Sequence, residues 1–132
     1  MKAVFKNAWG YQGDAMNLPV ENVESAISFY VDVMGFDLLS RSDLPNKSAV
    51  LGRDDIKMAI AENGGDPEQD GCAFEVDSAE VAFAEFKAGG LDKDSAEFKT
   101  ENNHGASWKV FYVVAPDGLC YWLGERQSQT TL

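Results

Sequence analysis

Two segments of this chain repeat one order of features. Residues 17–30 run from a short apolar stretch through a polar cap into an amphipathic segment that ends at Gly35. Residues 73–86 repeat this order and end at Gly89-Gly90. A repeat of this size usually forms one supersecondary unit that must bury its apolar face against a second copy. We therefore expect two strand-helix-hairpin modules, with a cup closed between them.

The repeat places the modules at about residues 14–62 and 71–125, within a single domain of residues 1–132. One domain agrees with the chain length, and 45% apolar residues are enough for a core. We predict an α+β fold.

In the first module, the alternation of residues 15–20 predicts a strand with Met16, Leu18 and Val20 toward the core. A helix then begins after a cap at Glu21 or Asn22 and ends at Gly35. Three further strands are expected at residues 36–40, 48–52 and 56–61.

The second module repeats this order, with a strand at residues 71–76 and a helix at 81–88 after a cap at Asp77-Ser78. The polar run that follows predicts a short strand near residues 96–99 and a mobile loop at 102–105. The remaining expected elements are a hairpin of residues 108–114 and 119–124 around Pro116-Asp117-Gly118, and a frayed tail at 126–132.

Charge and composition exclude some partners. A net charge of −11 repels phosphate backbones, so we expect no nucleic-acid partner. It would attract a cationic ligand, although scattered acidic residues mainly favour solubility. The sequence contains no apolar run of about 20 residues and no apolar leader, so we expect a cytoplasmic protein without membrane contact. Cys72 and Cys120 are then expected as reduced thiols, with a disulfide as the alternative.

Several motifs occur in a characteristic order. Phe29-Tyr30 precedes Met34-Gly35-Phe36, and Pro116-Asp117-Gly118 precedes an alternating strand. With these motifs, residues 14–125 resemble the vicinal oxygen chelate superfamily of glyoxalase I, extradiol dioxygenases and bleomycin resistance proteins. The resemblance implies two βαβββ modules whose strands form a curled mixed sheet around a cup, with the helices on its outer face. One scaffold of this kind hosts unrelated functions.

Enzymes of the resembling family usually hold a divalent metal with His, Glu or Gln side chains from four strands. Carried over by register, those positions are Ala15, Ala59, Gly71 and Trp122, and none can ligate a metal. We therefore expect no metal and no other cofactor. A register slip of one residue would offer Asp14, Lys57, Asp70 or Cys72, but it would also turn core residues to solvent.

Seven residues are candidates for contact with a small organic ligand. Trp122 could stack on a planar or cationic ligand, or it could fill the vacated metal position. The sole histidine, His104, lies in the predicted loop, where a solvated side chain is the alternative to an acid-base role. The full candidate set is Asn17, Lys57, Glu75, His104, Trp108, Cys120 and Trp122.

Two classes of function remain open. The first is a metal-free binding protein of the bleomycin-resistance type, which sequesters an aromatic or cationic molecule in a cup or dimer groove. The second is a glyoxalase- or dioxygenase-like enzyme with a non-standard or metal-independent site, for example with Glu75 as base and Lys57 or His104 as acid. The resemblance also implies a homodimer. Residues 2–11 form an aromatic arm that would cover a neighbouring subunit or fold back on its own sheet.

Overall fold

The structure of the protein is a computed structural model that describes residues 2–103 and 105–129. Its elements, in chain order, are β1 (Phe5–Gly10), β2 (Leu18–Pro19), α1 (Val23–Ser28), the π-helical turn η1 (Phe29–Val33), β3 (Asp37–Ser42), β4 (Ser48–Arg53), β5 (Ile56–Ala61), the 3-10 turn η2 (Pro67–Gln69), β6 (Gly71–Val76), α2 (Ala79–Ala88), β7 (Lys99–Asn103), β8 (Ala106–Val114) and β9 (Cys120–Gln129).

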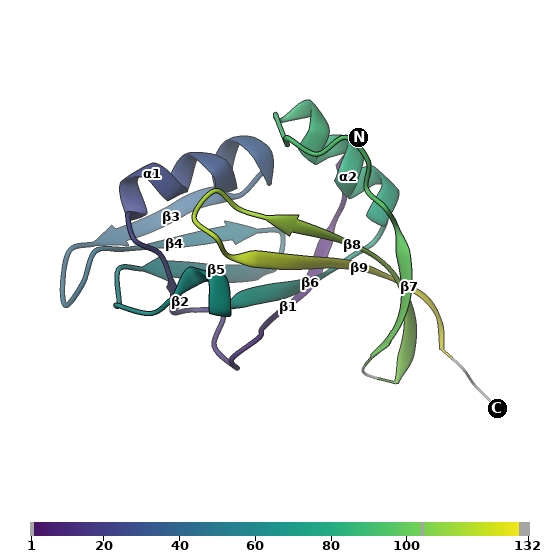
Figure 1. Cartoon of the computed structure of the whole chain (residues 1–132), viewed down its shortest axis with the longest axis horizontal. Coiled ribbons are helices and arrows are strands. Elements are labelled where there is room, and N and C mark those ends of the chain that lie inside the picture. The colour runs from purple at the N-terminus through teal and green to yellow at the C-terminus, as the bar shows by residue number, and fades with distance from the viewer. Residues whose placement is uncertain (1, 104, 130–132) are drawn as a thin grey trace.

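The strands form two unclosed sheets, in the orders β2-β5-β4-β3 and β1-β6-β9-β8-β7. In each sheet the first strand of a module pairs parallel with its last strand, β2 with β5 and β6 with β9. The other pairs are antiparallel. Helices α1 and α2 lie on the same side of the strands (Figure 1). The predicted α+β fold of two repeated modules is therefore confirmed.

The two faces of the five-stranded sheet differ in what they bury. Successive side chains of a strand point to opposite faces. On β9, Tyr121 and Leu123 are fully buried in the large core that also includes helix residues. Trp122, between them, belongs to a smaller cluster with Trp108 and Val110 on the opposite face. The helix-free face is thus lined by aromatic side chains.

The start and end of the first helix follow the sequence signals. The Asn22 side chain accepts a hydrogen bond from the backbone N–H of Ser25, which caps α1. The helix continues as η1, where the Met34 N–H bonds the Phe29 carbonyl five residues earlier. Gly35, with φ of 73°, then ends the helix in a conformation that favours glycine.

The first predicted strand is shorter than expected, and Met16 is not a core residue. The Asp14 carboxylate accepts a hydrogen bond from the Met16 N–H, and this turn interrupts the strand alternation. Met16 is consequently 47% exposed, whereas Leu18 and Val20 are buried.

The polar run of the second module forms a hairpin arm instead of a strand near residues 96–99 and a loop. Residues 99–103 are β7, which pairs with the first half of β8. The prediction of a frayed tail is also wrong for residues 126–129, because β9 continues to Gln129 against β8, whereas residues 130–132 lie outside the described residues. Pairing between strands, which polar composition does not reveal, orders this region. Position 104 lies outside the described residues.

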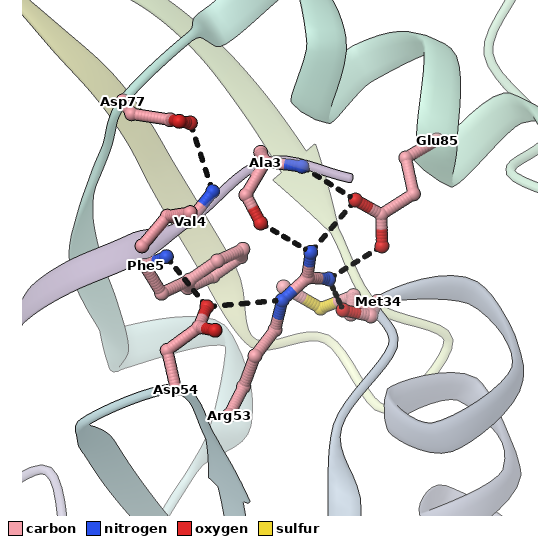
Figure 2. Close-up of polar contacts among 8 residues, drawn as sticks. All are labelled: Ala3, Val4, Phe5, Met34, Arg53, Asp54, Asp77 and Glu85. Atoms are coloured by element: carbon pink, nitrogen blue, oxygen red, sulfur yellow. Dashed lines mark hydrogen bonds and ion pairs between the residues drawn. The ribbon is translucent and has the colours of Figure 1, made fainter. Parts of the chain in front are cut away.

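The N-terminal arm folds back on its own chain. Its strand β1 pairs antiparallel with β6, so the arm completes the five-stranded sheet. Figure 2 shows how its first residues are fixed by side chains from both modules. Arg53 donates to Glu85 at 2.6 and 2.7 Å and to the Ala3 carbonyl at 2.7 Å. Asp54 accepts from the Phe5 N–H at 2.8 Å. The arm is therefore held at a defined position relative to the sheet.

Two further features of the fold are the character of its helices and the state of its cysteines. Within the described residues, neither helix has the length and apolar character needed to cross a membrane. Both Cys72 and Cys120 are free thiols in the structure. Burial raises the pKa of Cys72 to about 12, which makes this thiol a poor nucleophile.

Candidate functional site

All three tryptophans of the chain lie together on the helix-free face of the five-stranded sheet. Trp9 comes from β1, Trp108 from β8 and Trp122 from β9. The Trp108 ring contacts Trp9 edge to face at a centroid distance of 6.2 Å and Trp122 at 5.2 Å. Such T-shaped pairs have the favoured geometry of aromatic contacts, so these rings form an ordered wall.

A cleft of about 270 Å³ opens on this wall. Its lining residues are Trp9, Gly10, Tyr11, Ala73, Asn103 and Trp122. Pockets for drug-sized ligands usually enclose about 300–1,000 Å³. The cleft is therefore of a size for one small ring system, or for one ring of a larger molecule.

Trp122 both fills the sheet face and forms part of the cleft. Its side chain is folded back over Gly124, where an added Cβ would lie 2.3 Å from the indole Cη2 atom. Its indole N–H donates to Glu101 at 3.1 Å. Only 6% of the residue is exposed. Trp122 therefore presents ring surface to the cleft, because its one polar donor is already bonded.

Glu101 on β7 connects the hairpin arm to the aromatic wall. One carboxylate oxygen accepts from Trp122, and the other accepts from the Tyr112 hydroxyl at 2.6 Å. Burial, together with the hydrogen bond to Glu101 and its negative charge, raises the pKa of Tyr112 to about 12. Tyr112 is therefore a hydrogen-bond donor at neutral pH, and it holds Glu101 in place.

A second carboxylate on the same face, Glu75, forms an ion pair. It is 5% exposed, accepts from the Asn7 amide at 2.7 Å and pairs with Arg126 at 3.6 Å. The Arg126 guanidinium also lies over the Trp108 ring, 4.6 Å from its centroid. This cluster ties β1, β6, β8 and β9 together beside the cleft.

At the other end of the cleft, Tyr11 covers Gly71. An added Cβ on Gly71 would lie 2.5 Å from the Tyr11 ring and 1.9 Å from the Cys120 carbonyl oxygen. The Tyr11 hydroxyl is 4.0 Å from the Cys120 sulfur. Only glycine fits at this point, because ring and backbone occupy the space of a side chain.

The strand register confirms how the two modules correspond. Leu18 pairs with Ile60 in one sheet, and Phe74 pairs with Leu123 in the other. All four side chains are fully buried. A slip of one residue, which would turn them to solvent, is therefore excluded.

In this register, the residues at the metal-ligand positions do not fit a metal. The side chains of Ala15 and Ala59 have no atom that could ligate a metal, and Gly71 has no side chain. The indole N–H of Trp122 has no free lone pair for a metal, and it donates a hydrogen bond to Glu101. At Gly71, the surrounding atoms leave no room for a ligating side chain. Across the described part of the chain, no three His, Cys, Asp or Glu side chains are grouped to hold a metal ion.

The structure brings together some of the predicted ligand residues. Glu75, Trp108 and Trp122 share the helix-free face, and Cys120 lies at its edge beside Tyr11. Trp108 itself is fully buried and supports the wall from behind.

The other predicted residues lie elsewhere. Asn17 lies just before β2 and accepts from Asn63, and the exposed Lys57 lies on β5 of the four-stranded sheet. Lys57 on β5 and Glu75 on β6 belong to different sheets, and Glu75 pairs with Arg126. His104 falls outside the described residues.

Sequence reasoning missed four residues that build this site. The sequence predicts Trp9 and Tyr11 only as parts of an arm, and the position of that arm depends on long-range pairing with β6. Glu101 and Asn103 lie in the polar run, which has no alternation of apolar residues to indicate a strand. The sequence does contain one signal of an aromatic face, because Trp108 and Trp122 both alternate with core residues on adjacent strands.

The family model described as "Glyoxalase/Bleomycin resistance protein/Dioxygenase superfamily" matches residues 13–120. Among curated protein sequences, none gave a significant match.

Solved structures with the same fold have low sequence identity. A bleomycin resistance determinant encoded on the transposon Tn5 is 21% identical, with a TM-score of 0.64 over 86% of this chain and 96% of that one. An integron cassette protein from the V. cholerae mobile metagenome is 17% identical, with a TM-score of 0.65 over 85% and 92%. An antibiotic binding protein from Streptomyces sp. CB03234 is 18% identical, with a TM-score of 0.58 over 85% and 93%.

Proposed function

Because the chain belongs to the Glyoxalase/Bleomycin resistance protein/Dioxygenase superfamily, we propose that it is a metal-free binding protein that sequesters a small aromatic or cationic molecule. The observation that carries this proposal is the cleft bounded by Trp9, Tyr11 and Trp122. Aromatic faces offer stacking and cation-π contacts to a planar ligand. The positions that hold metal in the resembling enzymes carry no ligating group here.

Two of the solved structures with this fold are described as a bleomycin resistance determinant and an antibiotic binding protein. They support ligand sequestration as a use of the fold, although their low identity transfers no particular ligand. The cleft volume favours a ligand of one or two fused rings in each chain.

The test is a thermal-shift screen of the protein with aromatic compounds, organic cations and divalent metals. A compound that binds only the native state raises the melting temperature. We expect organic compounds to raise it and to change tryptophan fluorescence, because all three tryptophans lie at the site. Divalent metals should give no rise.

A matched pair of variants locates the binding. Ala73 lines the cleft and pairs in register with both Trp9 and Trp122, so Ala73→Leu should fill the space and abolish the ligand-induced shift. Ala84→Leu makes the same change on the exposed surface of α2 and should leave the shift intact. Stabilisation by a metal, or equal ligand responses in the two variants, would overturn the proposal.

We also place the protein in the cytoplasm as a homodimer. The free Cys72 and Cys120 thiols favour a reducing compartment. A dimer is favoured by the exposed Leu38 and Leu39 on β3, which is an edge strand, and by Leu44, which is 82% exposed. Light scattering after size exclusion should give twice the chain mass, and a monomer at all concentrations would contradict this arrangement.

A further inference from the structure

Glu101 is a half-buried carboxylate on the hairpin arm, and its partners differ from those of Glu75 on the same face. Its carboxylate accepts from the Trp122 indole, the Tyr112 hydroxyl and, at 3.5 Å, the Asn103 amide. All three donors are electrically neutral. Trp122 and Asn103 are themselves lining residues of the cleft, so Glu101 lies directly behind its wall.

The charge of Glu101 is not compensated by an ion pair within the described residues. Lys99, two positions earlier on β7, is exposed and farther than 4.0 Å from it. Arg126 pairs with Glu75. The two acidic groups of this face therefore differ, because among the described residues Glu75 has a cationic partner and Glu101 has none.

Two features make this charge available to a ligand. A carboxylate offers about four lone-pair sites, of which the protein uses three at Glu101. The site is also bounded by aromatic rings, which lower the local dielectric and strengthen attraction over a few ångströms. The negative faces of the same rings attract a cation.

We propose that Glu101 determines the charge of the ligand, so that the cleft selects a flat organic cation over a neutral molecule of the same shape. The inference rests on the proposed binding function. In the proposed site, the rings of Trp9 and Trp122 supply the stacking surface, and Glu101 supplies the charge preference from behind that surface.

A pair of probes of equal shape tests the preference. 1-Methylquinolinium and its carbon isostere 1-methylnaphthalene differ in charge but hardly in size, so their dissociation constants separate charge from stacking. Titration of tryptophan fluorescence should show the cation bound about tenfold more tightly at low salt. The advantage should shrink as salt is added.

Variants then assign the preference to one residue. Glu101→Gln keeps the shape and most hydrogen bonds, and it should reduce affinity for the cation about tenfold while leaving the affinity for 1-methylnaphthalene unchanged. A merely structural role would lower both affinities together. Glu21→Gln removes the same charge at an exposed position outside the cleft and should change neither.

The outcomes separate the two proposals. Equal binding of both probes, or a Glu101→Gln protein that keeps the cation preference, would overturn the inference and leave the binding function standing. If neither probe binds the folded protein, the binding function fails and the inference fails with it.

Discussion

The ring of Tyr11 covers Gly71 so closely that a Cβ on Gly71 would lie 2.5 Å from its Cε2 atom. Gly71 is one of the four positions at which enzymes of the resembling family carry a metal ligand. The N-terminal arm therefore occupies, with the aromatic side chain of Tyr11, space that a ligating side chain would need. The same arm supplies Trp9 to the cleft.

We expect Gly71→Ala to destabilise the protein by at least about 2 kcal/mol, because the new methyl group meets the backbone oxygen of Cys120 as well as Tyr11. Gly52→Ala is the matched control. There the nearest atom belongs to the exposed, rotatable Leu39 side chain, so the loss should be small. Urea unfolding measures both, and equal losses would contradict the packing described at Gly71.

A second prediction concerns the network that fixes the arm. Arg53 is almost completely buried, and Glu85→Ala would leave its charge without its bidentate partner. Loss of one partner of a buried pair costs about 3–5 kcal/mol. Urea unfolding should show such a loss for Glu85→Ala and little for Glu24→Ala, which removes an exposed pair with Arg41.

A loss of similar size in both variants would show that the Arg53 network is not what holds the arm. The prediction also extends to the cleft, because the arm carries Trp9 and Tyr11. Tryptophan fluorescence of folded Glu85→Ala protein should therefore differ from that of the parent, whereas Glu24→Ala should leave it unchanged.

The buried hydroxyls of Tyr30 and Tyr121 should contribute unequally to stability. Tyr30 donates to Asp117 at 2.8 Å and contacts the Tyr121 hydroxyl at 2.6 Å. Tyr30→Phe would remove the partner of the buried Tyr121 hydroxyl and of the half-buried Asp117 carboxylate, at a cost of about 1–3 kcal/mol. Tyr121→Phe keeps the bond to Asp117 and should cost less. The reverse order in chemical denaturation would exclude Tyr30 as the centre of this network.

Asp117 makes stability depend on pH. Burial raises the pKa of its carboxyl in the folded protein, so the folded state holds this proton more tightly than the unfolded state. The resulting stabilisation is complete below the unfolded pKa, near 4, and is lost as pH rises through the raised folded value. The stability of the parent relative to Asp117→Asn should therefore fall as pH rises above about 4. A difference independent of pH would refute the assignment.

The elements that sequence predicted well are those with local signals. Asn22 and Ser78 cap the helices, and Gly35 ends the first of them, because capping depends on a few adjacent residues. The repeat and the alternation of β9 predicted the strand register that the structure shows in both sheets.

The site itself depended on pairing that the sequence does not display locally. Glu101 reaches Trp122 only because β7 folds as an arm against β8, and its residues are polar on both faces. Trp9 reaches the cleft only because β1 adds to β6 across more than 60 residues of chain. Lys57 does not line this cleft, because the strands of the two modules form separate sheets.

The most direct test of a ligand cleft at the three tryptophans uses their indole N–H signals in the NMR spectrum of ¹⁵N-labelled protein. On titration with 1-methylquinolinium or 1-methylnaphthalene, the Trp9 and Trp122 signals should shift saturably, because both rings line the cleft. The shifts should disappear in Ala73→Leu. Saturable binding that leaves both signals unmoved, or no binding by the folded protein, would contradict the account.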